Sequence, residues 1–499
     1  MRDIFDLERL PPAVDAFLRD SNPWWTNSAG PPLPPYRRWA FGAIQRRLDS
    51  GLAPIVVVRG PRQVGKTTIQ QQIILDLLRN RNVPPTHVIR VQFDDLPSLR
   101  GIADPMLALT RWYESRILGK SCNQAAQDGQ PVWLFFDEVQ NQRDWAPQLK
   151  SLVDGRAVKV LVTGSSALRI EAGRDSLAGR ITQVELGTLL LREIAGLQGN
   201  ADVPSLLGDN GLDKLLRTDF WEEAQSFGVR HRVARDQAFA AFSARGGYPL
   251  AHAHPDIAWP EIADQLNETV IKRAIQHDLR MGEQGRKRDP QLLEEVYRLA
   301  CRYAGQAPGQ AVYVSSIQQT LNANVGWQRV LTYLRFLDGA MLLRLVEPLE
   351  IRLKKRKGNA KLCLCDHGLR ASWLQEVIPI DPAALQLAPH LADLAGRIVE
   401  SAVGYFLSGI PHLDVAHFPE RGAEPEVDFI LTIGEKRIPL EVKYRSKIDP
   451  HRDTLGLQTF LEKSVYGAPF GILVSMNDNV TVPDPRIRCI SLPSLLWTR

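Results

Sequence analysis

Long hydrophobic runs and cysteine pairs are missing from this sequence. Its longest apolar runs, such as 55–58 and 132–136, are strand-sized, whereas a helix that crosses a bilayer needs about 20 apolar residues. The first ten residues, MRDIFDLERL, lack the positive-then-apolar order of a secretory signal. Five cysteines are scattered along the chain, and Cys363 and Cys365 have no second pair with which to complete a zinc site. We therefore expect a cytoplasmic protein with reduced thiols and no membrane partner.

Charge of one sign is not in large excess either. The 61 Lys and Arg residues exceed the 56 Asp and Glu residues by five, and 44% of the chain is hydrophobic. This composition excludes a wholly disordered or collagen-like chain. The mildly basic balance is compatible with nucleic-acid contact without demonstrating it. At about 150 residues per domain, the 499 residues predict about three domains.

The first half of the chain divides into an arm and an α/β region. Residues 1–40 contain Trp24, Trp25 and the proline-rich segment 30–35, which favour an extended arm pinned to a surface by its tryptophans. Residues 41–195 alternate helices with short apolar strands, predicted at 55–59, 87–93, 132–137, 158–163 and 181–186. Continuously apolar strands that alternate with helices indicate a parallel sheet covered on both faces.

The second half predicts three further regions. Residues 196–305 are mostly helical and suit a lid. Residues 306–375 contain helices followed by two strands, at 341–348 and 360–366, which is the order of a winged helix. Residues 385–499 return to mixed α/β character.

A phosphate-binding loop follows the first strand of the α/β region. Residues 60–67 match G-x-x-x-x-G-K-[ST] at every defined position, with a strand before them and a helical pattern after. The glycines let backbone N–H groups converge on phosphates, Lys66 adds a charge, and the Thr67 hydroxyl can ligate Mg²⁺. The predicted ATP-binding residues here are Gly60, Pro61, Arg62, Gln63, Val64, Gly65, Lys66, Thr67 and Thr68.

The matching acidic motif ends the strand at 132–137. Asp137 would lie near the magnesium, and Glu138 would orient and deprotonate the attacking water. The alternative is a strand that merely ends in surface acids. One further strand, 87–93, lies between the two motifs in sequence, so we infer a strand inserted between the loop strand and the Asp137 strand.

This order resembles the ASCE division of P-loop NTPases, whose AAA+ members also carry a Glu after the Asp. The resemblance implies a sensor residue where strand 158–163 ends, at Thr163 or Ser165. It also implies an arginine finger, for which Arg174 and Arg180 are candidates. A structural or solvated arginine is an equally open interpretation of both.

The motifs GPRQVGKTT, FFDEVQ, TGSSA and LAGR together resemble the prokaryotic AAA-type ATPases that carry a C-terminal DUF4143 region. Segments 246–249, 269–271 and 366–369 agree with that resemblance. Two features depart from it, namely the arm before residue 37 and Ala274, where an acidic residue is expected. Segment 247–249, Gly-Tyr-Pro, is also similar to the GxP element of switch-type STAND ATPases, which contacts the adenine; a turn with no ligand role is the alternative.

Four charged residues near the end of the chain form a second candidate site. Glu400 lies in a helical stretch, Asp428 begins a strand, and Glu441 and Lys443 lie two apart on the next strand. Residues two apart in a strand project from one face, where Asp428 can meet them. Asp428 and Glu441 could bind Mg²⁺ with Glu400 completing the shell, while Lys443 positions or activates water.

This pattern resembles the PD-(D/E)xK restriction-endonuclease-like fold. The E-x-K element is intact at 441–443, the PD element reads Val427-Asp428, and Gln458 is similar to an extra polar residue of some members. The resemblance implies a metal-dependent nuclease. The alternative is an inactive descendant used for nucleic-acid binding or assembly.

Two basic clusters favour contact with a nucleic-acid backbone. The first falls between the two strands of the predicted winged helix and comprises Arg352, Lys354, Lys355, Arg356, Lys357 and Lys361. The second comprises Arg280, Arg286, Lys287 and Arg288. A solvated charge run is the alternative for both.

Together these features predict an α/β protein with a P-loop NTPase sheet, a helical lid, a winged helix and a restriction-endonuclease-like domain. We expect an Mg²⁺-dependent ATPase that couples its nucleotide state to the binding or cleavage of nucleic acid, with DNA as the expected partner. The other hypothesis is a regulatory or defence switch whose C-terminal domain is inactive and serves binding or assembly. A homo-oligomer is expected if ATP binds between subunits, and protein partners are left open.

Overall fold

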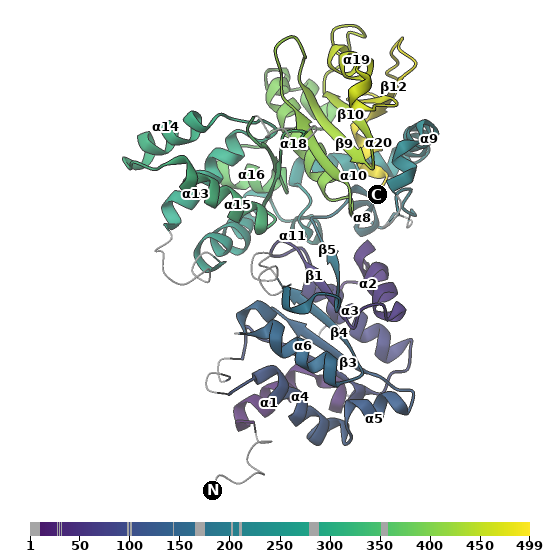
Figure 1. The fold of residues 1–499 in the computed structure, drawn as a ribbon, viewed down its shortest axis with the longest axis vertical. Coiled ribbons are helices and arrows are strands. Elements are labelled where there is room, and N and C mark those ends of the chain that lie inside the picture. Colours follow the sequence, from purple (N-terminus) through teal and green to yellow (C-terminus); the bar gives the residue numbers. More distant parts are fainter. Residues whose placement is uncertain are drawn as a thin grey trace. The chain divides into compact units, whose positions relative to one another are not determined.

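The chain folds into two compact units, Met1–Leu186 and Gly187–Arg499 (Figure 1). The computed structural model describes residues 10–499 except 27, 29, 31, 97–98, 100–101, 143, 165–174, 201–202, 209–211, 279–288 and 351–357. Within these described ranges, no helix combines the length and the apolar character that a membrane span requires.

The first unit is built on a five-stranded parallel sheet in the order β2-β3-β4-β1-β5. Its strands are β1 (Ile55–Arg59), β2 (Val88–Gln92), β3 (Val132–Asp137), β4 (Val158–Gly164) and β5 (Ile181–Glu185). Successive residues Val56, Val57 and Val58 point to opposite faces, yet each is at most 1% exposed. Both faces of the sheet are therefore covered, as the apolar strands predicted.

A strand does lie between the loop strand and the Asp137 strand, but it is not the expected one. The pairings Val58↔Thr163 and Phe136↔Val162 place β4 between β1 and β3. The segment predicted at 87–93 forms β2, which pairs with β3 at the sheet edge. The correction follows from crossover order, which strand patterns in the sequence do not encode.

Helices flank this sheet and complete the core. They are α2 (Trp39–Ser50), α3 (Lys66–Arg79), α4 (Pro105–Tyr113) with its π-helical continuation Glu114–Leu118, α5 (Cys122–Gln127) and α6 (Trp145–Gly155). Leu109 of α4 and Leu149 of α6 share one apolar cluster with Val57, Leu134 and Val160 of the sheet. Helices α2 and α3 contact each other and also contact β4.

The N-terminal arm is partly helical rather than extended. Helix α1 (Pro12–Ser21) buries Val14 and Leu18 in the core of the first unit. A proline is tolerated in the first helical turn, where the missing N–H has no helical partner in any case. As expected, the tryptophans pin the following turn, since Trp24 Nε1 and Trp25 Nε1 donate to the Val88 carbonyl at 3.0 and 2.9 Å.

The second unit begins with helices that share a core with its C-terminal sheet. The helices are α8 (Leu191–Leu197), α9 (Thr218–Arg230), α10 (Arg232–Arg245), α11 (Pro249–Ala253), α12 (Trp259–Leu266) and α13 (Pro290–Arg302). Trp221 of α9 and Phe239 of α10 lie in one apolar cluster with Phe429 and Trp497. Helices α9 and α10, which lie in the predicted lid region 196–305, therefore pack on the last part of the chain.

The predicted helix-and-hairpin region is present. Helices α14 (Gln310–Leu321) and α15 (Trp327–Gly339) precede β6 (Leu343–Val346) and β7 (Lys361–Leu364), which pair antiparallel. Leu349 N donates to the His417 carbonyl at 2.7 Å, which joins the hairpin to strand β8 of the C-terminal sheet.

The C-terminal sheet is mixed and has the order β12-β11-β10-β9-β8. Its elements are α16 (His367–Leu374), α17 (Pro382–Gln386), α18 (Ala392–Ser408), β8 (Asp414–Phe418), β9 (Val427–Ile433), β10 (Lys436–Lys443), α19 (Leu455–Glu462), β11 (Gly471–Ser475), β12 (Ile487–Ser491) and α20 (Leu492–Trp497). Strands β8, β9 and β10 form an antiparallel meander, and β10, β11 and β12 are parallel. The meander places residues of β9 and β10 side by side.

Candidate functional site

The predicted phosphate loop joins β1 to the first residue of α3. Gln63 and Gly65 have positive φ values of 62° and 92°, a backbone conformation that glycine adopts without strain. A side chain at Gly60 would collide with the Leu186 carbonyl. Lys66 Nζ donates to the carbonyls of Gly60 and Pro61 at 2.9 and 2.6 Å, which holds the ammonium over the loop. The start of α3 and Lys66 thus present positive charge on one side of the loop.

Three elements contribute hydrogen-bond donors to the carboxylate of Asp137, which is 1% exposed. Thr67 Oγ1, from α3, donates to Asp137 Oδ2 at 2.9 Å, and Thr163, from β4, donates to Asp137 Oδ1. Arg90, from β2, donates to Asp137 Oδ2 at 3.0 Å. The structure therefore brings Thr67 and Asp137, the two predicted magnesium ligands, together and adds Thr163, one of the two predicted sensor residues.

Sequence reasoning missed Arg90. Its side chain is 8% exposed, and its Nε and NH2 groups donate to Gln70 and Gln92 at 2.9 and 2.8 Å. The available signal was a single arginine inside the otherwise apolar strand Val88–Gln92. A charged residue at such a position is seldom buried without a partner.

Glu138 has an uncommon backbone conformation directly after Asp137. Its φ is 51°, a left-handed value that costs a non-glycine residue roughly 1–3 kcal/mol. Gln140 Nε2 donates to its carboxylate. Such strained residues cluster at functional sites, which is consistent with the role predicted for Glu138 as the base.

The other predicted nucleotide ligands divide into two groups. Val64 is buried, and its carbonyl accepts from Arg38 NH1 at 2.6 Å, a loop support that sequence reasoning missed. Arg180 instead pairs with Asp154 of α6, at 2.5 Å from Nε and 2.9 Å from NH2. This pairing favours the structural interpretation of Arg180, and its role as an arginine finger stays a prediction. Ser165 and Arg174 lie outside the described residues.

The second predicted site lies in the C-terminal unit, where a close approach of α18 builds it. Gly404 lies one turn after Glu400, and a side chain there would collide with Cys363 of β7 and lie 2.8 Å from the Phe429 ring of β9. Glycine lets the helix come this near to both strands. Glu400 is thereby brought to Asp428, the neighbour of Phe429.

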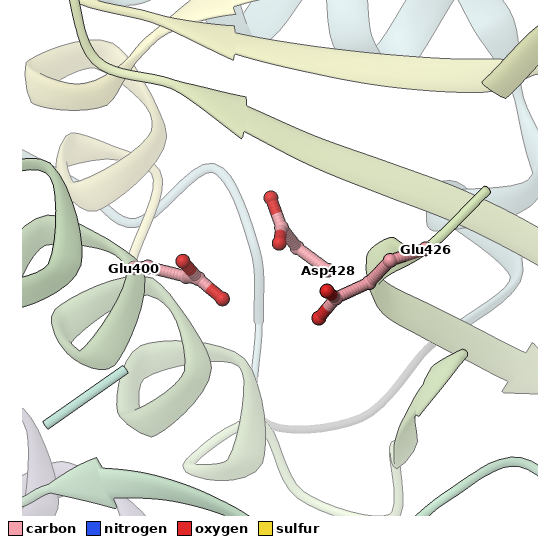
Figure 2. Close-up of side chains that lie close together, drawn as sticks. All are labelled: Glu400, Glu426 and Asp428. Atoms are coloured by element: carbon pink, nitrogen blue, oxygen red, sulfur yellow. The ribbon is translucent and has the colours of Figure 1, made fainter. Parts of the chain in front are cut away.

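Three carboxylates meet at this point (Figure 2). Glu400, Glu426 and Asp428 each offer an oxygen, and these oxygens all lie within 4.8 Å of one another. The predicted trio was Glu400, Asp428 and Glu441, so Glu426 is the residue that sequence reasoning missed. The signal was its position two residues before Asp428, which puts both on one face of an extended chain. We call Glu400, Glu426 and Asp428 the acidic cluster.

The acidic cluster holds a lysine at its centre. Lys361 Nζ lies 3.2 Å from both Asp428 Oδ1 and Glu426 Oε1 and donates to Glu400 Oε1. The side chain is 1% exposed, and its Nζ lies 5.2 Å from the centre of the Phe429 ring. The prediction that Lys361 belongs to a basic surface is therefore wrong, because the first residue of β7 points into the unit.

Glu441 and Lys443 form an adjacent pair. Lys443 donates to Glu441 Oε1, and the Asp428 backbone N–H lies 3.4 Å from Glu441 Oε2. The Val442 N–H donates to Asp428 Oδ2 at 2.8 Å. The predicted meeting of Asp428, Glu441 and Lys443 on neighbouring strands is present.

Charge pairing sets the protonation of this region. Burial opposes the charge of Lys361, but Asp428 and Glu400 raise its pKa well above the ordinary value. Burial acts to raise the pKa of Asp428, yet the charges of Lys361 and Lys443 hold it below its usual range. Burial and the Asp428 charge raise the pKa of Glu441 to about 8 and that of Glu400 well above its usual range. Lys361 is therefore an ammonium at neutral pH.

Segment 246–249 packs within the second unit. Tyr248 is fully buried, and the carboxylate of Asp366 accepts from the N–H groups of Gly247 and Leu369. A side chain at Gly246 would collide with Asp366. These contacts support the interpretation of a turn, and the adenine contact stays a prediction.

Several remaining predictions fall on undescribed residues. In the first basic cluster, Arg352, Lys354, Lys355, Arg356 and Lys357 lie outside the described residues, as does the whole second cluster, Arg280, Arg286, Lys287 and Arg288. Gln458 lies on α19, where its Nε2 donates to Thr454 at 2.9 Å.

An uncharacterized protein of Methanocaldococcus jannaschii is 21% identical to this chain, and the alignment covers 73% of this chain and 70% of the relative. An uncharacterized protein of Mycobacterium tuberculosis is 29% identical over 32% of this chain, and the aligned part spans 30% of that relative. A Walker-type ATPase of Pyrococcus abyssi aligns with 68% of this chain and 96% of its own, at 13% identity and a TM-score of 0.37. The yeast Hsp104–ADP complex aligns with 62% of this chain and 40% of its own, at 13% identity and a TM-score of 0.29. At these TM-scores, neither similarity bears on the fold.

Two family models match the chain. Residues 53–195 match an AAA domain, and residues 236–377 match a domain of unknown function, DUF8612. The downstream match is to DUF8612 where the sequence suggested DUF4143, so the latter resemblance stays an expectation. The first match covers the loop at 60–67, Asp137 and Thr163, whose geometry is given above. The chain therefore contains a region that matches an AAA domain, followed by a region that matches DUF8612.

Proposed function

We propose that this protein is an Mg²⁺-dependent ATPase whose nucleotide state controls nucleic-acid binding by its second unit. The observation that carries the ATPase part is the convergence of Thr67 and Thr163 on Asp137 beside the loop that ends at Lys66. This is the arrangement of groups that nucleotide hydrolysis requires: phosphate donors, hard oxygen ligands and a neighbouring carboxylate.

The donor set at Thr67 and Asp137 fits magnesium, which prefers hydroxyl, carboxylate and water oxygens. When bound, the ion neutralises charge on the phosphate oxygens. The loop amides and Lys66 bind the phosphates and fix their orientation. Glu138 accepts the proton of the attacking water, and its left-handed backbone sets the direction of its carboxylate.

Glu138→Gln tests this assignment. The variant should bind a fluorescent ATP analogue like wild type, but its phosphate release should fall about 100-fold or more, because an amide cannot accept the water's proton. Lys66→Ala should instead weaken nucleotide binding. Glu435→Gln, an exposed change in the turn between β9 and β10, is the matched control. Wild-type hydrolysis by Glu138→Gln would remove Glu138 from the mechanism.

Nucleic-acid binding is proposed for the second unit on two grounds. The sequence places five cations at 352–357, between β6 and β7, and the antiparallel strands β9 and β10 carry Asp428 and Glu441 of the restriction-endonuclease-like pattern side by side. Lys361 within the acidic cluster favours binding or assembly over cleavage. Its ammonium holds the position between Glu400 and Asp428 at which the predicted metal would bind, so the donor set there does not fit a divalent ion.

Cleavage of nucleic acid remains the competing hypothesis and has its own test. Purified full-length protein is incubated with supercoiled DNA, with Mg²⁺ or Mn²⁺, and with and without ATP. We expect no strand breaks under any of these conditions. Nicking by wild type that disappears in Asp428→Asn/Glu441→Gln would establish a nuclease and refute the binding proposal.

A further inference from the structure

The number of N–H donors on Lys361 equals the number of carboxylates in the acidic cluster, which surround its ammonium. An ammonium has three N–H donors, and three carboxylates from different segments lie around it. Glu400 comes from α18, Asp428 from β9, and Glu426 from the residues just before β9. All three carboxylates therefore share one partner atom, Lys361 Nζ, and the lysine side chain is 1% exposed.

Three carboxyl groups this close together repel one another when ionised, and the negative charge of Asp428 is one of the causes that raise the pKa of Glu400. One oxygen of each group lies within 4.8 Å of the others, a separation at which like charges repel one another. A divalent ion, a protein cation or a bound proton can relieve this repulsion. In this chain the ammonium of Lys361 lies at the point to which all three oxygens are directed.

The position of Lys361 in the fold supports a permanent arrangement. The residue opens β7, which pairs with β6 along its whole length. Leu349 N donates to the His417 carbonyl at 2.7 Å, and the His417 ring bonds to the Asn359 carbonyl at 2.9 Å. The backbone at the base of this hairpin is therefore fixed to β8, which limits how far Lys361 could withdraw from the cluster.

We infer that Lys361 is the resident cation of the acidic cluster, in the place of a divalent metal, and that it ties the β6–β7 hairpin to the C-terminal sheet. The centre then has no room for a metal between Glu400 and Asp428. It serves to hold β6 and β7, between which the sequence carries the basic segment 352–357, in one orientation on the sheet. This inference concerns the second unit and does not depend on nucleotide binding by the first.

Replacing the cation gives a test with a thermal readout. Nucleotide-free wild type, Lys361→Met and the surface control Lys436→Met are melted with EDTA and with millimolar Mn²⁺. We expect Lys361→Met to unfold at a lower temperature than wild type in EDTA and to regain part of the loss in Mn²⁺. The control should behave as wild type. A Lys361→Met protein that folds but gains no Mn²⁺ dependence would overturn the inference.

A second measurement decides the matter if Lys361→Met does not fold. Mn²⁺ binding to nucleotide-free wild type and to Glu426→Gln is compared by calorimetry. Glu426 is half exposed, so this variant should fold. Equal Mn²⁺ binding by the two proteins is expected if Lys361 already fills the cluster. A wild-type binding event that weakens tenfold or more in Glu426→Gln would show that the cluster takes metal despite Lys361, and the inference would fail.

The same comparison separates this inference from the proposed function. ATP hydrolysis by wild type and by Glu138→Gln tests the ATPase assignment, and neither protein is altered in the acidic cluster. Equal ATP hydrolysis by wild type and Glu138→Gln would refute the assigned ATPase mechanism while leaving the Mn²⁺ result unchanged. Asp428-dependent metal binding by wild type would refute the resident-cation inference while leaving ATP hydrolysis unchanged.

Discussion

Asp137 accepts hydrogen bonds from three side chains, and Arg90 is the donor whose loss is simplest to interpret. It lies on β2, away from the phosphate loop in sequence, and also bonds Gln70 of α3. Removing the guanidinium leaves Asp137 without one of its donors and leaves buried amide oxygens unpaired. Arg90 is thus a positioning residue that acts through Asp137.

Arg90→Gln should lower kcat for ATP hydrolysis about tenfold with a smaller change in KM, because the loop and Lys66 are untouched. Arg79→Gln, an exposed change at the end of α3, is the control. Steady-state kinetics over a range of Mg²⁺ concentrations provides the measurement. An Arg90→Gln protein whose kcat equals that of the control would show that Arg90 has no bearing on Asp137.

Asp366 and His367 are neighbours whose pKa values burial shifts in opposite senses. Burial raises the pKa of Asp366 to about 7 from 3.8 and lowers that of His367 to about 4 from 6.5. Between pH 4 and pH 6.5 the unfolded chain binds a proton at His367, whereas the folded chain does not. His367 therefore makes the fold less stable as the pH falls through this window, and Asp366 has the opposite effect.

His367→Gln should remove the first contribution. The free energy of unfolding of the variant minus that of wild type should increase as the pH falls from 6.5 to 4. The increase is at most about 1.4 kcal/mol per pH unit. Urea unfolding of both full-length proteins at several pH values measures the difference, in which the other titrating groups cancel. A difference that does not change with pH would contradict the shifted pKa of His367.

The N-terminal arm is hydrogen-bonded to the edge strand β2. Asn22 is fully buried, and its side chain both donates to the Arg90 carbonyl at 2.9 Å and accepts from the Arg90 N–H at 2.6 Å. One side chain thus copies the hydrogen bonding of a neighbouring strand. The strand held in this way is the one that carries Arg90.

Asn22→Ala should destabilise the first unit by about 1–3 kcal/mol per buried group left unpaired. In the variant, backbone amides of the edge strand β2 should exchange with solvent faster than they do in wild type. Those of β3, which lies inside the sheet, should change less. Hydrogen exchange followed by mass spectrometry resolves the two strands, and Thr26→Ala, an exposed position of the same arm, is the control. Unchanged exchange in β2 would mean that the arm contributes no protection there.

Local pattern predicted the strands of the first unit because β3 and its neighbours are continuously apolar, and it predicted the loop and Asp137 because motif and strand end coincide. It did not predict α1, since the prolines around it favour an extended chain and its helix depends on burying Val14 and Leu18. It also missed the strand order, because β4 enters the sheet by a crossover. Lys361 was misplaced for the same kind of reason. Its partners lie 39 to 67 residues away, so the sequence near it shows only a row of cations.

At the scale of the whole molecule, the proposed coupling between ATP and nucleic acid is the property to test. If ATP binding changes DNA affinity, DNA must change ATP affinity by the same factor. Reversing the charges of Lys354, Lys355, Arg356 and Lys357 should weaken DNA binding, and each lost phosphate contact should reduce the salt slope by about 0.9. Fluorescence anisotropy at several salt concentrations, with and without ATP, measures both effects. Affinity equal to wild type would dismiss the segment as a DNA contact, and ATP hydrolysis in the same variant should be unchanged.

The arm on β2 also bears on how copies of this chain can assemble. An uncovered edge strand has unpaired backbone N–H and C=O groups, with which a strand of another chain can pair and so extend the sheet into a fibre. Asn22, Trp24 and Trp25 already occupy the outward-facing backbone groups of Val88 and Arg90. These contacts oppose pairing of a second chain along Val88 and Arg90, so we expect preparations that lose the arm to proteolysis to aggregate first.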